Sequence, residues 1–212
     1  PAPPSLPPPS PSSPFVVAMG NMFAKQQKIN CIMVGPKGVG KTTILYTLLL
    51  NESNKTWTAT NAYNYEVIQR TSRMNRRTYK YDMHMWDLAG DDELRSLWPY
   101  YYNAIENANV LIYVVNANNR KQTRACRPEF NRLVHDTKFR NAYKMVIVNV
   151  HKPADENKMD AAEVRLALGI DRLDQTCQVE VHEMNASNLS QVTSITQKIC
   201  QHFTKKMYGN KK

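Results

Sequence analysis

The sequence has no apolar run that approaches the roughly 20 residues needed for a membrane-spanning helix. Apolar residues still make up 42% of the chain, as in folded proteins. Its 212 residues are enough for one sizeable core but few for two. We therefore expect one soluble globular domain with appended tails.

Cysteine is scarce, and acidic residues are outnumbered by basic ones. The four cysteines show no C-x-x-C pair and no matching histidine spacing, so we expect reduced and mostly packed thiols, as in a cytoplasmic protein. The formal net charge of +10 favours an anionic partner, and nucleotide phosphate, nucleic acid or a phospholipid surface would all qualify. The cysteines are Cys31, Cys126, Cys177 and Cys200.

The first 18 residues have a composition that cannot form a core. Eight of the 12 prolines fall within residues 1–14, with serines between them. We expect residues 1–18 to be a disordered leader. The first methionine is Met19, and Gly20 could be myristoylated only if translation starts there.

From residue 28 onward, short and largely apolar runs alternate with helical stretches. Runs of this kind at 29–34, 110–115 and 145–148 predict strands buried on both faces. A further strand is expected near Val179 and Val181. The pattern predicts an α/β fold with a mostly parallel central sheet and helices on both faces.

Two segments between the first and second apolar runs show a period of two. Tyr63, Tyr65 and Val67 alternate with polar residues, as do the apolar residues at 79–85, which predicts a half-exposed hairpin. The last helix carries one apolar stripe that we assign to the core. The stripe consists of Leu189, Val192, Ile195, Ile199 and Phe203.

The segment 35–42 reads GPKGVGKT and matches the phosphate-loop pattern G-x-x-x-x-G-K-[ST] between a buried strand and a helix. Backbone N–H groups must converge on phosphate oxygens, so side chains at Gly38 and Gly40 would obstruct their approach. Lys41 would reach the β- and γ-phosphates, and the Thr42 hydroxyl would bind Mg²⁺. The alternative is a glycine-rich turn that binds nothing.

A D-x-x-G motif follows the second strand of the hairpin. Asp87 would bind Mg²⁺ from its other side, and the amide of Gly90 would face the γ-phosphate. Together with Thr60, this motif describes two loops that close only when a third phosphate is present.

These motifs resemble the ADP-ribosylation factor (Arf) and Arf-like small GTPases, and the resemblance extends from Met19 to about the C-terminus. It is carried by MGNMFA at 19–24, GKTTILY at 40–46, WDLAG at 86–90 with LW at 97–98, and DAAE at 160–163. It implies a P-loop GTPase fold that binds GTP or GDP with Mg²⁺. It further implies vesicle traffic at the Golgi or another endomembrane, with an exchange factor, a GTPase-activating protein and effectors as partners of a monomer.

The motifs and the resemblance together assign the site residues. Thr60 is implied as the switch I threonine, and Tyr63, Trp86 and Tyr101 as the aromatic trio that effectors contact. The expected metal ligands are Thr42, Thr60 and Asp87. The expected nucleotide contacts are Gly35, Lys37, Gly38, Val39, Gly40, Lys41, Thr42, Thr43, Thr60, Gly90 and Lys152.

Two positions depart from the family pattern. Asp91 replaces the glutamine that orients the attacking water, and its negative charge predicts slow GTP hydrolysis with at most partial rescue by an arginine finger. The guanine-reading motif N-K-x-D aligns with HKPA at 151–154, which keeps Lys152 but places Ala154 where a carboxylate would accept two hydrogen bonds from guanine. Asp155 lies one residue late and would substitute only if the loop shifts.

The resemblance also sets the expected domain boundaries. We assign 19–27 to a short membrane-type segment, 28–206 to the GTPase domain and 207–212 to a basic tail. The hairpin carries five basic residues without an acid between them, which indicates either a solvated tip or a contact with an anionic membrane or partner. They are Arg70, Arg73, Arg76, Arg77 and Lys80.

The leading hypothesis is a GTP-regulated switch with weak hydrolysis. The alternative is a degenerate, non-enzymatic interaction protein that keeps the phosphate site and has relaxed or lost guanine specificity. A P-loop kinase would need an acceptor site and an arginine-rich lid, and nucleic-acid binding has only the net charge in its favour.

Overall fold

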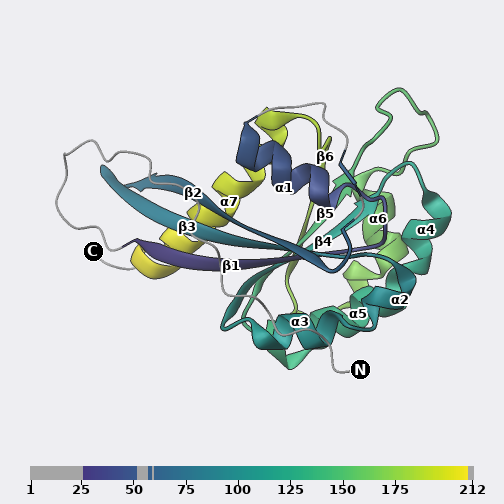
Figure 1. Ribbon diagram of the computed structural model, residues 1–212, viewed down its shortest axis with the longest axis horizontal. Helices are drawn as coiled ribbons and strands as arrows, with labels where there is room; N and C mark the ends of the chain where they lie inside the picture. Colours follow the sequence, from purple (N-terminus) through teal and green to yellow (C-terminus); the bar gives the residue numbers. More distant parts are fainter. Residues whose placement is uncertain (1–25, 52–56, 59, 210–212) are drawn as a thin grey trace.

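A computed structural model describes residues 26–51, 57–58 and 60–209 (Figure 1). The expectations for residues 1–18 and for Gly20 lie outside this part of the chain. The described residues form a six-stranded sheet in the order β2-β3-β1-β4-β5-β6. Every neighbouring pair is parallel except β2 with β3. The strands are β1 (Gln27–Val34), β2 (Tyr63–Met74), β3 (Arg77–Leu88), β4 (Ala108–Asn116), β5 (Tyr143–Asn149) and β6 (Val179–Met184).

Helices cover both faces of the sheet, as the α/β prediction requires (Figure 1). Helices α1 and α7 lie on one face, and α3, α5 and α6 pack on the other. Within the described ranges no helix is long and apolar enough to cross a bilayer. The helices are α1 (Lys41–Leu50), α2 (Asp92–Arg95), α3 (Trp98–Ala104), α4 (Arg120–Ala125), α5 (Arg127–His135), α6 (Ala161–Leu168) and α7 (Leu189–Tyr208), with short 3-10 turns at Thr137–Phe139 and Ile170–Arg172.

Strand β1 shows why the predicted central strands are apolar without alternation. Cys31 and Met33 face the core beneath α1 and α7, whereas Ile32 and Val34 face the core on the opposite side. Both faces of the strand are therefore removed from water, and both must be apolar. The same reasoning accounts for β4 and β5.

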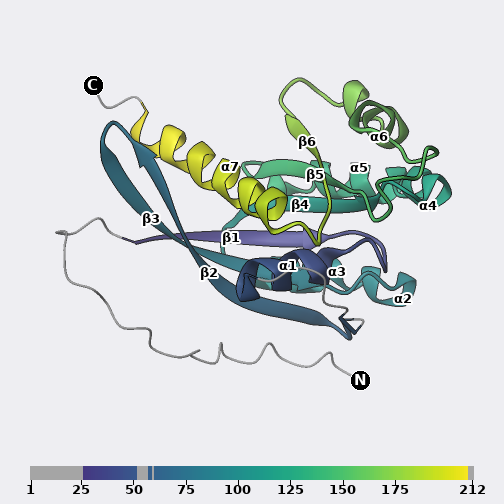
Figure 2. The same ribbon diagram turned by 90° about the horizontal axis from the view of Figure 1, so that it is seen from above.

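The hairpin of β2 and β3 closes through a two-residue turn at Asn75 and Arg76, both of which have positive φ angles (51° and 62°). Such turns match the twist of antiparallel strands. The alternation predicted for β3 is confirmed, because Tyr81, Met83 and Met85 are buried. The hairpin extends alongside the C-terminal half of α7 (Figure 2).

In β2 the residues that face the core are not the alternating residues Tyr63, Tyr65 and Val67. Ile68 and Ser72 are buried, whereas Tyr65 packs on the opposite face with its ring centroid 4.4 Å from that of Trp86. Arg70 also departs from the picture of a solvated basic tip. Its Nε donates to Thr196 Oγ1 at 3.2 Å, and burial lowers the pKa of its guanidinium, while the other four basic residues are exposed.

Helix α7 ends two residues beyond the expected domain boundary at 206. Tyr208 belongs to the helix, and its ring stacks on Tyr79 of β3 with a centroid distance of 4.3 Å. The hairpin and the end of α7 thus support each other. The predicted apolar stripe is confirmed at its centre by the buried residues Val192, Ile195 and Ile199. Three of the four cysteines are buried, as expected, and Cys177 is partly buried.

Candidate phosphate and metal site

The phosphate loop connects β1 to α1 and depends on glycine for its path. Gly35, Gly38 and Gly40 all have positive φ angles, of 140°, 76° and 97°. A Cβ on Gly40 would lie 2.2 Å from Asn149 Nδ2, so this position has no room for a side chain. Gly38 has open space around it, and its backbone conformation rather than crowding by the protein requires glycine.

Lys41 places a buried cation inside this loop. Its Nζ donates to the carbonyl oxygens of Gly35 at 2.8 Å and Pro36 at 3.0 Å, and the residue is only 6% exposed. Burial lowers the pKa of the ammonium to about 8. An anion bound in the loop would favour the charged form again.

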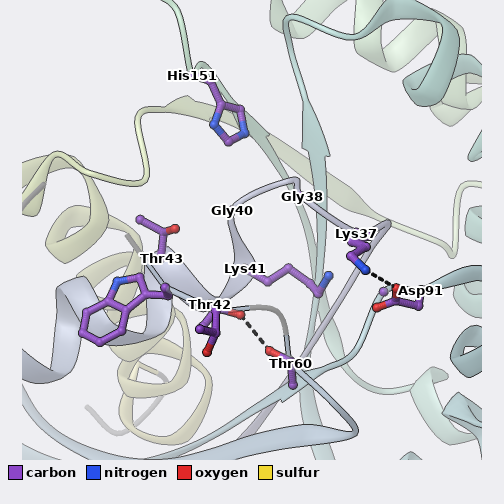
Figure 3. Close-up of a pocket in the computed structure, with 12 residues that line it drawn as sticks. Lys37, Gly38, Gly40, Lys41, Thr42, Thr43, Thr60, Asp91 and His151 are labelled. Atoms are coloured by element: carbon purple, nitrogen blue, oxygen red, sulfur yellow. Dashed lines mark hydrogen bonds and ion pairs between the residues drawn. The ribbon is translucent and has the colours of Figure 1, made fainter. Parts of the chain in front are cut away.

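Three oxygen-bearing side chains from distant segments meet beside the first turn of α1. Thr42 Oγ1 donates to Asp87 Oδ2 at 2.6 Å. It also lies 2.9 Å from Thr60 Oγ1 (Figure 3). Thr60 Oγ1 also donates to Asp87 Oδ2, at 3.2 Å. Asn64 Nδ2 donates to the same carboxylate oxygen at 3.0 Å and was not expected from the sequence. The three predicted metal ligands are thus brought together.

The oxygen set fits a divalent cation of the Mg²⁺ type. Asp87 Oδ1 is buried and has no hydrogen-bond partner among the described residues. Burial raises the pKa of this carboxyl, while the hydrogen bonds from Thr42, Asn64 and Thr60 act in the opposite direction. A hard cation prefers oxygen ligands. Bound here, it would give Asp87 Oδ1 a partner and balance the buried negative charge.

A cavity of about 240 Å³ opens over the loop. Nine of its lining residues were expected from the sequence, counting Asp91. Trp57, Thr58 and His151 were not expected, and the ring of Trp57 packs against that of Tyr46 at a tilt of 30° with a centroid distance of 4.4 Å. The lining residues are Lys37, Gly38, Gly40, Lys41, Thr42, Thr43, Trp57, Thr58, Thr60, Gly90, Asp91 and His151.

Lys152, Gly35 and Val39 do not line this cavity in the described part of the chain. Val39 is fully buried and contributes its backbone, since its carbonyl oxygen accepts from Asn149 Nδ2 at 2.8 Å. Lys152 is exposed, and its backbone N–H donates to Asn118 Oδ1. Its predicted nucleotide contact is therefore not part of this cavity.

Asn149 is a structural link that the sequence reasoning missed. It ends β5, and besides the bond to Val39 its Oδ1 accepts from Ala186 N at 2.8 Å. Its amide therefore joins the phosphate loop to the segment that precedes α7. The signal in the sequence was an asparagine directly after a buried apolar run.

Asp155, which would replace the lost guanine acceptor only if the loop shifted, is engaged by other residues. The Asp155 carboxylate accepts from Asn118 Nδ2 and from the backbone N–H of Asn157, each at 2.9 Å. These hydrogen bonds lower the pKa of Asp155. His151, at the position of the motif asparagine, lies within 3.1 Å of Asn149 Nδ2 through its Nε2.

The predicted aromatic trio forms one cluster. The ring centroid of Tyr63 lies 5.8 Å from that of Trp86 and 5.6 Å from that of Tyr101. Tyr101 is only 6% exposed, so part of the cluster serves packing. Tyr65 extends it, and its hydroxyl lies 2.6 Å from His84 Nδ1.

The connection between β3 and α2 packs directly on the phosphate loop at Gly90. A Cβ on Gly90 would lie 2.3 Å from the Gly35 carbonyl oxygen and 2.6 Å from Lys41 Nζ. Trp98 Nε1 holds the preceding residue by donating to the Ala89 carbonyl oxygen at 2.7 Å. The D-x-x-G segment is therefore positioned where it can respond to whatever the loop binds.

Comparisons with known proteins agree with this architecture. A family model described as the ADP-ribosylation factor family matches residues 15–203. A similar solved structure is the Arl6 (BBS3) small GTPase from Trypanosoma brucei with the bound nucleotide analogue GppNp. It is 20% identical, with a TM-score of 0.64 over 83% of this chain and 99% of that chain, which establishes a common fold. The chain therefore belongs to the ADP-ribosylation factor family.

Proposed function

We propose that the chain is a GTP-binding molecular switch that uses Mg²⁺ and hydrolyses GTP slowly. The observation that carries this proposal is the meeting of Thr42, Thr60 and Asp87 beside the buried Lys41 ammonium. A buried cation and a cluster of oxygen ligands are what a metal-bound polyphosphate requires. The GppNp bound by the Arl6 protein supports the same class of ligand.

Each group has a distinct role in this proposal. The backbone amides of the phosphate loop face the phosphates, and Lys41 supplies an ammonium to the β- and γ-phosphates. Thr42, Thr60 and Asp87 would hold Mg²⁺. When bound, the metal neutralises negative charge on the phosphates. The role in membrane traffic at the Golgi or another endomembrane that the resemblance implies stays a prediction.

Identification of the nucleotide carried by the purified protein tests the proposal. The protein is denatured and the released nucleotide is separated by chromatography, and we expect GTP or GDP. ATP or ADP would instead indicate altered base selection. A site that stays empty after Mg²⁺ and nucleotide are added would contradict a switch function.

The second candidate is a non-enzymatic interaction protein with relaxed or lost guanine specificity. It is favoured by the base-reading segment, where Ala154 supplies no acceptor and both oxygens of Asp155 are engaged by Asn118 and Asn157. A site built on hydrogen bonds to a base discriminates strongly, and loss of those bonds removes the discrimination. Comparable affinities for GTP and ATP analogues would favour this function.

We expect slow intrinsic hydrolysis, which Asp91→Gln should accelerate about tenfold or more, since a neutral amide can orient a water molecule without repelling the γ-phosphate. Single-turnover hydrolysis of bound GTP measures the rate. Asp171→Gln, at an exposed carboxylate paired with Arg165 away from the cavity, is the matched control. Equal and fast rates in the wild type and Asp91→Gln would contradict the assignment of Asp91.

A further inference from the structure

An ion pair stands at the mouth of the cavity and joins the phosphate loop to the start of α2. Lys37 Nζ lies 2.5 Å from Asp91 Oδ1, and both side chains line the cavity (Figure 3). The lysine side chain is 62% exposed and the aspartate 31% exposed. The hydrogen bond from Lys37 to Asp91 raises the pKa of the ammonium, which therefore stays charged at neutral pH.

The backbones on both sides of this pair contact other parts of the fold, whereas the lysine side chain is largely exposed. Gly90 packs directly on the carbonyl oxygen of Gly35, and Gln122 Nε2 donates to the carbonyl oxygen of Lys37 at 3.3 Å. The long stem of Lys37 lies mostly in solvent. Its ammonium can therefore change partner without a rearrangement of the loop.

Two lysines line the cavity, and they differ in burial and in the groups that they contact. Lys41 is buried and its Nζ contacts two loop carbonyls, whereas Lys37 contacts an anion that carries one negative charge. Exposed ion pairs of this kind contribute little stability, so a more highly charged anion can displace Asp91. The terminal phosphate of a nucleoside triphosphate is such an anion.

We propose that Lys37 is a second phosphate-binding cation, which Asp91 holds beside the loop until the terminal phosphate of a bound nucleotide takes it. This inference rests on the proposed function and deepens it, because it names a residue that distinguishes a triphosphate from a diphosphate. Asp91 then acts on the terminal phosphate in two ways. It competes for Lys37, and it stays close enough to repel the phosphate.

The test compares affinities for a non-hydrolysable GTP analogue and for GDP, measured by calorimetry with Mg²⁺. In the wild type the ratio of the two affinities defines the selectivity. Lys37→Ala should lower affinity for the triphosphate about tenfold and for the diphosphate at most about threefold, since only the terminal phosphate loses a charge-assisted contact. Lys37→Arg should keep most of the selectivity, and Asp91→Asn should raise it several-fold.

Two variants at a distance control for general charge effects. Lys121→Ala removes an exposed lysine on α4, and Asp171→Asn breaks the exposed Arg165–Asp171 pair. Both should leave the selectivity within about twofold of the wild type, a difference well under the tenfold effect expected for Lys37.

The outcomes separate this inference from the proposed function. If the wild type binds both nucleotides and Lys37→Ala leaves the selectivity unchanged, the inference is wrong and the proposed function stands. If the wild type binds neither nucleotide, both are wrong. Thermal unfolding of each variant verifies that the substitutions, which lie at exposed or half-exposed positions, leave the fold intact.

Discussion

Lys41→Ala is expected to lower the affinity for a GTP analogue by about 100-fold or more, which corresponds to roughly 3 kcal/mol. The ammonium of Lys41 is the buried positive charge of the phosphate loop. Among the described residues that line the cavity, no other lysine is as buried. Without it, the negative charge of the phosphates would lose its buried positive counterpart. Calorimetric titration measures the loss, with Lys121→Ala as an exposed lysine control.

The pH dependence of the nucleotide affinity provides a second test of the contribution of Lys41. Its pKa in the free protein is about 8, below the ordinary value of 10.5, and the protonated form is the one that binds phosphate. Affinity should therefore be nearly constant below pH 7 and should fall as the pH rises above 8, because binding must then take up a proton. Unchanged nucleotide and metal affinity in Lys41→Ala would remove the basis of the proposed function.

Gly35→Ala is expected to destabilise the fold by about 3–5 kcal/mol, the sum of backbone strain and overpacking. The residue has a φ angle of 140°, and a Cβ there would lie 2.2 Å from the carbonyl oxygen of Val114 in the central strand β4. A buried strand cannot move aside to make room. For a domain of this size the unfolding temperature should fall by roughly 10 °C.

Gly38→Ala is the matched control for this substitution. It lies in the same loop and also has a positive φ angle, of 76°, but nothing lies within 4 Å of its ideal Cβ position. Only the conformational penalty of about 1 kcal/mol should remain. Thermal unfolding of both variants is measured in EDTA and without nucleotide, so that differences in ligand affinity do not affect the comparison. Equal losses would show that crowding against β4 is not what fixes Gly35.

The phosphate loop and the central strands could be predicted because their signals are local. A loop of eight residues carries its own glycines and lysine, and a strand that is apolar at every position must be covered on both faces. In β2 the period of two indicated a strand but not its covered face. That choice depends on α7, whose Thr196 receives a hydrogen bond from Arg70 across 126 residues of sequence.

The missed parts of the site depend on contacts between distant segments. Asn149 and Val39 are separated by 110 residues, and Lys37 and Asp91 by 54. Lys37 and Asp91 do not belong to one sequence motif. The position of the ion pair at the mouth of the cavity could therefore not be predicted from the spacing of the two residues in the sequence. The cluster of Thr42, Thr60 and Asp87 was reached only because family resemblance supplied Thr60.

Cation binding at Asp87 would act on the sheet as well as on the nucleotide site. Among the described residues Asp87 Oδ1 is buried without a partner, which lowers the stability of the end of the sheet where β3 meets the phosphate loop. A bound cation would remove this penalty, so metal occupancy and the stability of that region would be linked. While such a cation is bound, unfolding of that end of the sheet would carry the added cost of releasing it.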